Sequence, residues 1–194
     1  MSVVITKTYP APHIDEREIW RYAGCKEVNE DLRRLLLECI AEVKDKLAYR
    51  LCYCELSFQE KNGLCDFGNF SLQSHSLAKT LQGSQSVLLF SATVGIDVDR
   101  LITKYGKVSP TKALLFQAIG TERIEALCDE FCNEWKARGY ITTPRFSAGY
   151  GDLPLQSQKI ILSVLESYKK IGVGLNESFL MSPSKSVTAF FGIR

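Results

Sequence analysis

The chain has 194 residues and a mass of 21.8 kDa, which is enough for one large domain or two small ones with a real hydrophobic core. Its composition is 45% hydrophobic and 24% charged, which excludes collagen-like, low-complexity and disordered classes. Lys and Arg total 24 against 22 Asp and Glu, and these charges are interspersed along the chain. The sequence therefore argues against nucleic-acid binding and against an anionic-membrane patch.

The N-terminal residues 1–7 have no basic start, no apolar core and no cleavage site of a secretory signal. We therefore expect a cytoplasmic protein. The apolar run at residues 86–94 falls far short of the roughly 18 residues that would indicate a membrane span.

The seven cysteines are an odd number, which favours reduced thiols packed in the core over disulfides. Cys52 and Cys54 are expected to face the same side of a strand, and Cys128 and Cys132 lie one helical turn apart. Metal ligation stays open as an alternative, but the chain has only two histidines and no second Cys pair at zinc spacing. We therefore predict no metal site.

The first third of the chain is predicted to contain a long helix and a β-hairpin. Apolar residues recur at helical spacing over residues 27–50. Residues 50–58 alternate imperfectly between two faces, and the Asn62-Gly63 pair is a strong turn signal before a second apolar run at 64–70. A hairpin of these two runs is the simple interpretation.

Pattern and turn signals predict the later elements in chain order: a helix at 74–81 capped by Ser74, a buried strand at 87–94, a helix from 96 to 106, a long helix at 109–138, an ordered loop at 140–154, a helix at 155–170 and a strand at 186–192. The long helix has Ser109 as its N-cap and Pro110 at its first position, and Gly139 ends it. Because no regular βαβ repeat occurs, we expect an α+β fold with a largely antiparallel sheet, and no linker divides residues 1–194.

The loop at residues 145–152 is the first candidate site. Arg145 can grip a carboxylate with two hydrogen bonds, Gly149 lets backbone groups approach a ligand, and Tyr150 offers a flat wall with a polar tip. This combination suits a small zwitterionic ligand. The alternative places Arg145 in a surface ion pair and Tyr150 at the base of the loop.

Two carboxylates are further candidates. Glu125 lies near the middle of the apolar face of the long helix, where it could receive an ammonium group or, alternatively, be a charge at the solvated edge. Asp15 could do the same or simply cap a helix that follows it.

Several catalytic classes lose support because their motifs are absent from the sequence. There is no dinucleotide fingerprint after a strand, no phosphate-binding loop and no nucleophile elbow. A Cys-His nucleophilic site would require His13 or His75 to approach a cysteine in space.

Two runs resemble the C-terminal activation domain of cobalamin-dependent methionine synthase. They are Arg-Phe-Ser-Ala-Gly-Tyr at residues 145–150 and, more specifically, the Glu-Ser-Phe-x-Met-x-Pro-x-x-Ser-Val pattern within residues 174–187. Residues 113–127 are similar to the family's ligand-bearing helix and residues 89–95 to its central strand, while Asp15 fits its N-terminal region more loosely. The resemblance covers most of the chain.

The resemblance implies a C-shaped α+β fold with a bent antiparallel sheet, flanked by helices, and a shallow groove for S-adenosylmethionine. It implies that Arg145 holds the ligand carboxylate, that Ser147 and Gly149 offer backbone groups, and that Glu125 and Asp15 contact the amino group or other donors. Tyr150 would then stand near the upper face of the corrin, as the residue closest to the reaction.

The same resemblance implies a reactivation function. Inert cob(II)alamin on a partner protein is reduced by flavodoxin or a similar donor and is then methylated by S-adenosylmethionine. The partner would be the cobalamin-binding subunit of a split methionine synthase, or another corrinoid protein such as that of a demethylase. Because the sequence ends at Arg194 without the aromatic C-terminal segment of the family, the alternative is a docking module that covers a corrinoid protein without binding S-adenosylmethionine.

Overall fold

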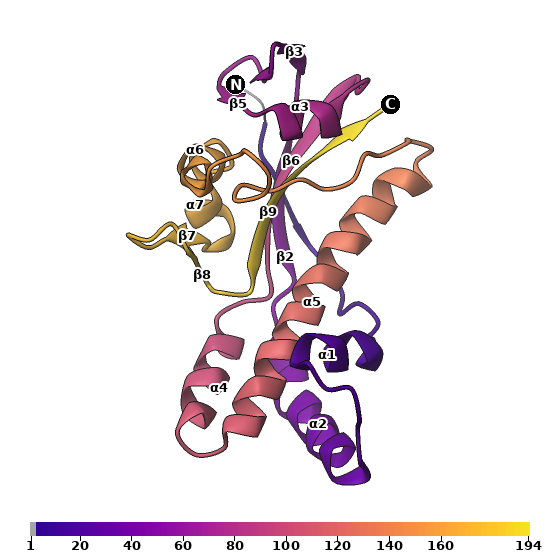
Figure 1. Ribbon diagram of the computed structural model, residues 1–194, viewed down its shortest axis with the longest axis vertical. Helices are drawn as coiled ribbons and strands as arrows, with labels where there is room; N and C mark the ends of the chain where they lie inside the picture. Colours follow the sequence, from indigo (N-terminus) through magenta and orange to yellow (C-terminus); the bar gives the residue numbers. More distant parts are fainter. Residues whose placement is uncertain (1–2) are drawn as a thin grey trace.

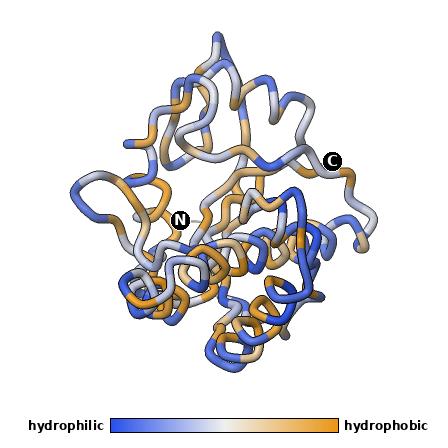
Figure 2. Tube along the Cα trace, turned by 60° about the horizontal axis from the view of Figure 1, so that its bottom comes forward, coloured by the Kyte–Doolittle hydropathy of each residue, from blue (hydrophilic) through white to orange (hydrophobic). Residues whose placement is uncertain are grey.

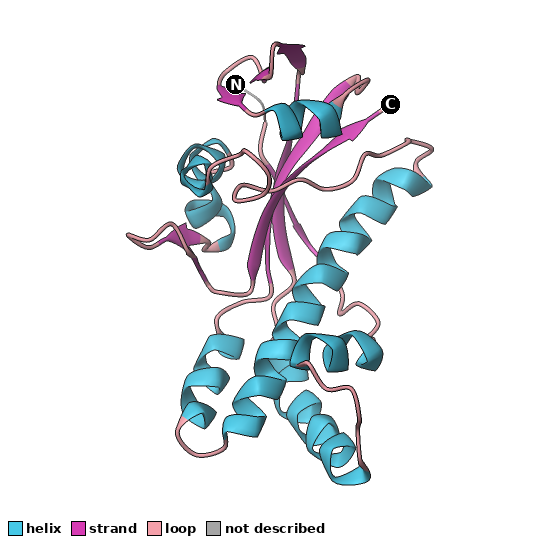
Figure 3. Ribbon diagram, in the orientation of Figure 1, coloured by secondary structure: helices cyan, strands magenta, loops and turns pink. Residues whose placement is uncertain are grey.

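A four-stranded antiparallel sheet lies at the centre of the fold, with its strands in the order β1-β2-β6-β9 (Figure 1). The computed structural model describes residues 3–194. The four strands are β1 (Ile5–Thr8), β2 (Arg50–Leu56), β6 (Ser86–Thr93) and β9 (Ser186–Ile193). The α+β class and the antiparallel sheet flanked by helices, both predicted from the sequence, are confirmed (Figure 3).

Helices on one face of this sheet enclose the larger core. Side chains that alternate along each strand, among them Tyr53, Phe90 and Phe191, point to this face and are at least nine-tenths buried. The covering helices are α1 (Glu16–Ala23), α2 (Glu30–Val43), α4 (Asp97–Gly106) and α5 (Pro110–Ala137), with a 3-10 turn at Lys44–Lys46. The long helix α5 crosses the face diagonally and extends past the ends of the strands (Figure 1).

The opposite face of the sheet is covered by shorter elements. Cys52, Leu89 and Phe190 point to this side, and Phe67 stacks on Phe190 with ring centroids 5.2 Å apart. The covering elements are β3 (Gln59–Lys61), β4 (Leu64–Asp66), β5 (Ser71–Gln73), α3 (His75–Leu81), a 3-10 turn at Leu155–Ser157, α6 (Gln158–Val164), α7 (Ser167–Ile171), β7 (Gly174–Leu175) and β8 (Met181–Ser182). Because both faces are covered, the central strands are hydrophobic along most of their length, whereas the helices alternate in hydropathy (Figure 2).

Local signals predicted three elements closely. Helix α5 begins at Pro110 after Ser109 and ends before Gly139, whose φ is +92°. Helix α3 has Ser74 as its N-cap, and the Ser74 hydroxyl accepts the Leu77 N–H at 3.0 Å. Strand β9 covers the predicted run and is paired with β6 along eight residues.

The predicted hairpin of residues 50–58 and 64–70 is wrong in its pairing. The Asn62-Gly63 turn does join two strands, but these are the short β3 and β4, while β2 pairs with β1 and β6 in the central sheet. The imperfect alternation of β2 has a physical cause, because its side chains are buried on both faces of that sheet.

Two predicted helices have different bounds from those expected. The helix predicted at 27–50 is α2, which begins after the N-cap Asn29 and ends at Val43 because the chain must turn to enter β2. The helix predicted at 155–170 is broken at Glu166, whose φ is +47°. This break lets Leu165 and Ile171 both bury their side chains in the core under the sheet.

The predicted ordered loop at 140–154 is confirmed, because it runs beside β9 as an additional edge. The N–H groups of Ile141, Thr143 and Phe146 donate to carbonyl oxygens of residues 194, 192 and 190, at 2.9, 3.0 and 2.9 Å. This pairing fixes Arg145 relative to the sheet.

The cysteines pack in the core, as predicted from their number and setting. Six are buried and Cys25 is partly exposed, and all seven are free thiols. Cys52 and Cys54 share one core, and Cys128 and Cys132 share the other. Within residues 3–194 no group of three or more His, Cys, Asp or Glu side chains is arranged to hold a metal ion, and no helix there is long and apolar enough to cross a membrane.

Candidate ligand groove

Two adjoining cavities meet at Glu125 and Arg145, and we call them together the groove. The first has a volume of about 410 Å³ and lies between the start of α1 and the middle of α5. It is lined by Pro12, His13, Asp15, Glu18, Tyr22, Glu122, Glu125, Ala126, Asp129, Glu130 and Arg145. The second has a volume of about 270 Å³ and is lined by Glu125, Arg145, Phe146, Ser147, Tyr150, Val187 and Ala189.

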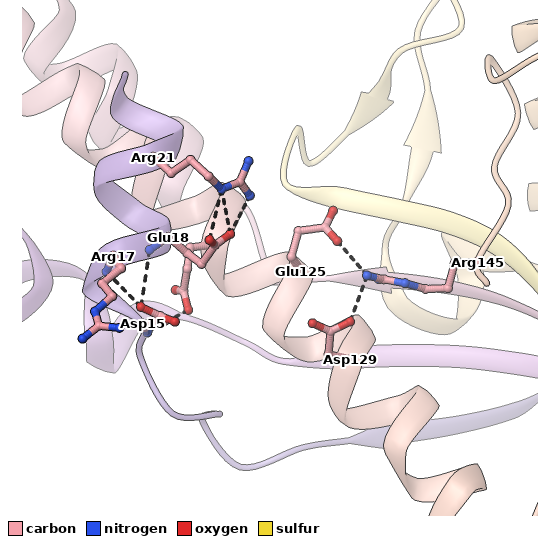
Figure 4. A network of polar contacts seen from close by, with 8 residues as sticks. Asp15, Arg17, Glu18, Arg21, Glu125, Asp129 and Arg145 are labelled. Carbon is pink, nitrogen blue, oxygen red and sulfur yellow. Dashed lines mark hydrogen bonds and ion pairs between the residues drawn. The ribbon is translucent and has the colours of Figure 1, made fainter. Parts of the chain in front are cut away.

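Arg145 is the cation at the centre of the groove. Its Nη2 atom donates to Glu125 Oε2 and to Asp129 Oδ1, each at 2.9 Å. Glu125 and Asp129 are four residues apart on α5, so both carboxylates face the same guanidinium (Figure 4). The arginine side chain is 24% exposed and lines both cavities, so a ligand in either of them can contact it.

Asp15 lies at the opposite side of the first cavity, at the N-terminus of α1. Its Oδ1 atom accepts the N–H groups of Arg17 at 2.9 Å and Glu18 at 3.4 Å (Figure 4). The capping role considered from the sequence is therefore confirmed. Asp15 also lines the groove, so capping and exposure to a ligand are compatible at this position.

The remaining predicted residues lie in the loop beside β9. Ser147 and Tyr150 line the second cavity, and the Tyr150 side chain is 68% exposed at its rim. Gly149 is the turn residue between them, with φ +92° and its N–H donated to the Leu153 carbonyl at 2.9 Å. The structure thus brings Arg145, Glu125, Ser147 and Tyr150 around one cavity, while Gly149 shapes the loop and lines neither.

A buried ion pair borders the groove, with Glu122 in its lining and Arg123 behind it. Arg123 and Glu122 are neighbours on α5 with side chains only 1% and 5% exposed, and the Arg123 Nε atom donates to Glu122 Oε2 at 2.5 Å. Burial disfavours the charge on Arg123, but the hydrogen bonds and charge of Glu122 outweigh it and raise the pKa of the guanidinium. The Arg123 guanidinium is therefore charged at neutral pH.

Carboxylates dominate the lining of the first cavity. Six are present, at positions 15, 18, 122, 125, 129 and 130, against the single guanidinium of Arg145. Glu18 is paired with Arg21 and Glu122 with Arg123, which leaves an excess of negative charge around Arg145. Burial, and then the charge of Glu125, raise the pKa of Tyr22, so its hydroxyl stays a neutral donor. Such a lining suits a ligand with one carboxylate and additional positive charge.

The sequence interpretation did not include Glu122, Arg123, Asp129 and Tyr22 among the site residues. One signal was available, since Asp129 follows Glu125 at the spacing of neighbours on a helix face. A second was the charged Arg123 in line with Ile119 and Leu127, both buried positions of α5. The backbone carbonyls that accept from Arg123 lie more than one hundred residues away, so the local sequence pattern does not indicate them.

The cysteines offer no nucleophile to the groove. Burial raises the pKa of the Cys128 thiol, which lies under the Glu125–Asp129 face, so the reactive thiolate is disfavoured. Among residues 3–194, the cysteine hydrogen bonds go to backbone carbonyls and to the Ser167 hydroxyl, with no histidine among the partners.

No family model matches the chain, and no curated protein matches it. Among solved structures, the chain is similar to a crystal structure of the MetH reactivation domain bound to AdoHcy. The match has a TM-score of 0.70 at 15% sequence identity and covers 98% of this chain and 78% of that chain. At this identity the likeness establishes the fold, and the predicted resemblance to the methionine synthase activation domain is confirmed as a likeness of fold.

Proposed function

We propose that this chain is an S-adenosylmethionine-binding reactivation subunit that supports the reductive methylation of cob(II)alamin carried by a partner protein in the cytoplasm. The observation that carries the proposal is the groove, in which Arg145 faces an excess of carboxylates. The fold is similar to that of a domain that binds the demethylated form of this ligand.

The groove fits the charges of S-adenosylmethionine. The Arg145 guanidinium can donate to the ligand's α-carboxylate, and Ser147 lies at the same cavity. The ammonium and sulfonium are cationic, and Glu125 and Asp15 line the cavity on either side of the space that they would occupy. The same carboxylates would repel an anionic nucleotide such as ATP.

The ligand, the partner protein and this chain each have a separate part in the proposed reaction. S-adenosylmethionine supplies a methyl group to a partner's corrin cobalt, after flavodoxin or a similar donor has added one electron to cobalt(II), and S-adenosylhomocysteine leaves. The chain's own residues bind and orient the donor, and no side chain needs to gain or lose a proton. Tyr150 lies exposed at the rim of the second cavity, where it can contact the face of a corrin on a docked partner.

One observation favours a second candidate, a docking module that covers a corrinoid protein without holding S-adenosylmethionine. Arg145 already donates to two carboxylates, and the Asp15 carboxylate already caps α1, so each has a partner without any ligand. A ligand must therefore displace or share these contacts.

Thermal unfolding with added ligand separates the two candidates. A ligand that binds only the native state raises the melting temperature in a concentration-dependent way. The reactivation subunit should show this shift with S-adenosylmethionine and S-adenosylhomocysteine but not with ATP, and Arg145→Ala should reduce the shift at the same ligand concentration. No shift, together with co-elution with a cobalamin-binding protein, would select the docking module.

A further inference from the structure

The Glu122–Arg123 pair ties one wall of the groove to α5. Besides its bonds to Glu122, the Arg123 guanidinium donates from Nη1 to the Pro12 carbonyl at 2.6 Å and from Nη2 to the His13 carbonyl at 2.5 Å. Glu122 in turn accepts the backbone N–H of Asp15 at 3.1 Å. Three successive contacts thus run from two neighbouring residues of α5 to a four-residue stretch of the N-terminal segment.

That four-residue stretch is the far wall of the first cavity. Pro12, His13 and Asp15 line it, and Glu125 lines it from α5 one turn beyond Glu122. Residues 12–14 lie in no strand or helix, between the end of β1 and Asp15, the N-cap of α1. The contacts of Arg123 and Glu122 therefore hold the segment that leads into α1 against α5, and with it the separation between Asp15 and Glu125.

An arginine is suited to this task in a way that other side chains are not. Its planar group carries five donors in a rigid fork, and here the fork reaches two carbonyl oxygens and a carboxylate at once. A buried ion pair contributes little net stability over an apolar pair of equal volume. The contribution of this pair lies in its geometry, because it holds the Pro12 and His13 carbonyls against α5.

We propose that Arg123, held by Glu122, is a positioning residue that sets the width of the groove and thereby the affinity for S-adenosylmethionine. The inference rests on the proposed function and adds a residue that does not itself line the groove. Arg123 acts through the Pro12–Asp15 wall, so a change at Arg123 must alter what Asp15 contributes to the ligand.

The test compares ligand affinity in the wild type and in Arg123→Lys, measured calorimetrically well below the melting temperature. Lysine keeps the charge opposite Glu122 but replaces the fork with a single ammonium, so the wall loses its fixed position. We expect the dissociation constant for S-adenosylmethionine to rise about tenfold, because binding must then order the wall. Should Arg123→Lys not fold, the double variant Glu122→Gln/Arg123→Met, which leaves no buried charge unpaired, is compared with Glu122→Gln alone, because both lack the Glu122 charge that lines the cavity.

A second set of contacts between α5 and the N-terminal part of the chain provides a matched control. About three turns further along α5, Glu134 pairs with Lys7 and accepts the Tyr9 hydroxyl at 2.7 Å. Glu134 lines neither cavity. Glu134→Gln should lower the unfolding free energy while leaving the dissociation constant within about twofold of the wild type.

A double-mutant cycle with Asp15→Asn distinguishes a positioning role of Arg123 from a merely structural one. Asparagine still caps α1, so this change removes only the charge that faces the ligand. We expect Asp15→Asn to weaken binding in the wild type and to have a smaller effect in Arg123→Lys. Three results would each overturn the positioning role of Arg123. They are equal effects of Asp15→Asn in both backgrounds, no effect of Asp15→Asn in the wild type, and an unchanged affinity in Arg123→Lys. A wild type that binds no S-adenosylmethionine would overturn the proposed function as well.

Discussion

Asp129 and Glu125 contact the same guanidinium, yet we expect their removal to have opposite effects on ligand binding. Each accepts from Arg145 Nη2 at 2.9 Å, and each must share that atom with an incoming ligand carboxylate. Glu125 also lines both cavities, so it can contact the ligand's ammonium, whereas Asp129 lines only the first and is 65% exposed. Asp129→Asn should therefore strengthen binding, and Glu125→Gln should weaken it.

The magnitude follows from the exposure of the pair. A partly exposed ion pair contributes about 0.5–1 kcal/mol, and a like charge about 4 Å from the ligand carboxylate adds roughly 1 kcal/mol of repulsion in water. Because the guanidinium keeps its contact with Glu125, only part of this is gained when Asp129 becomes neutral. We expect a gain of about 1 kcal/mol, which is about a fivefold lower dissociation constant.

The assay is calorimetric titration with S-adenosylhomocysteine, a zwitterion without net charge, so that the overall potential of the groove has little influence. Glu130→Gln is the matched control, because it removes one carboxylate from the same cavity and the same helix without touching Arg145. Its dissociation constant should match the wild type. Weaker binding by Asp129→Asn, or equal gains in both variants, would refute the idea that Asp129 competes for Arg145.

Three further changes have defined outcomes. Arg145→Ala should weaken S-adenosylmethionine binding by roughly 1.5–3 kcal/mol in a titration, since a charge-assisted pair is lost, and an unchanged affinity in a folded variant would remove Arg145 from the site. Gly192→Ala should lower the unfolding free energy by about 1–3 kcal/mol in urea, because its Cβ would lie 1.8 Å from Ser84 Oγ, while Gly106→Ala, with no atom within 4 Å, should not. Hydrogen bonds, first from the Ser74 hydroxyl and then from two backbone N–H groups, hold the pKa of Asp152 well below its ordinary value of 3.8. The stability from Asp152 is therefore present above pH 3.8 and lost as the pH falls through the lower folded pKa, so the advantage of the wild type over Asp152→Asn should shrink as the pH falls below 3.8.

Sequence patterns predicted the elements whose signals are local. Ser109-Pro110 and Gly139 mark the ends of α5, and Ser74 marks the start of α3, because capping and turn chemistry involve residues within one helical turn. The resemblance placed Arg145 and Glu125 in one site, and the structure brings them to 2.9 Å.

The features that the sequence did not predict depend on partners far along the chain. Strand β2 was assigned to a hairpin because the residues that pair with it in β1 and β6 lie between 31 positions (Leu56 to Val87) and 48 positions (Ile5 to Tyr53) away along the chain. The break at Glu166 follows from burying two side chains under the sheet, and the fork of Arg123 closes on backbone carbonyls of residues 12 and 13. Hydrophobic periodicity carries no information on such contacts.

Direct titration of the wild-type chain with S-adenosylmethionine tests the central claim, with ATP as the comparison ligand. We predict saturable binding of S-adenosylmethionine, and none of ATP, at a groove whose cation is Arg145. Heat signals no different from dilution at millimolar S-adenosylmethionine would contradict a ligand-binding groove and leave only the docking of a corrinoid protein.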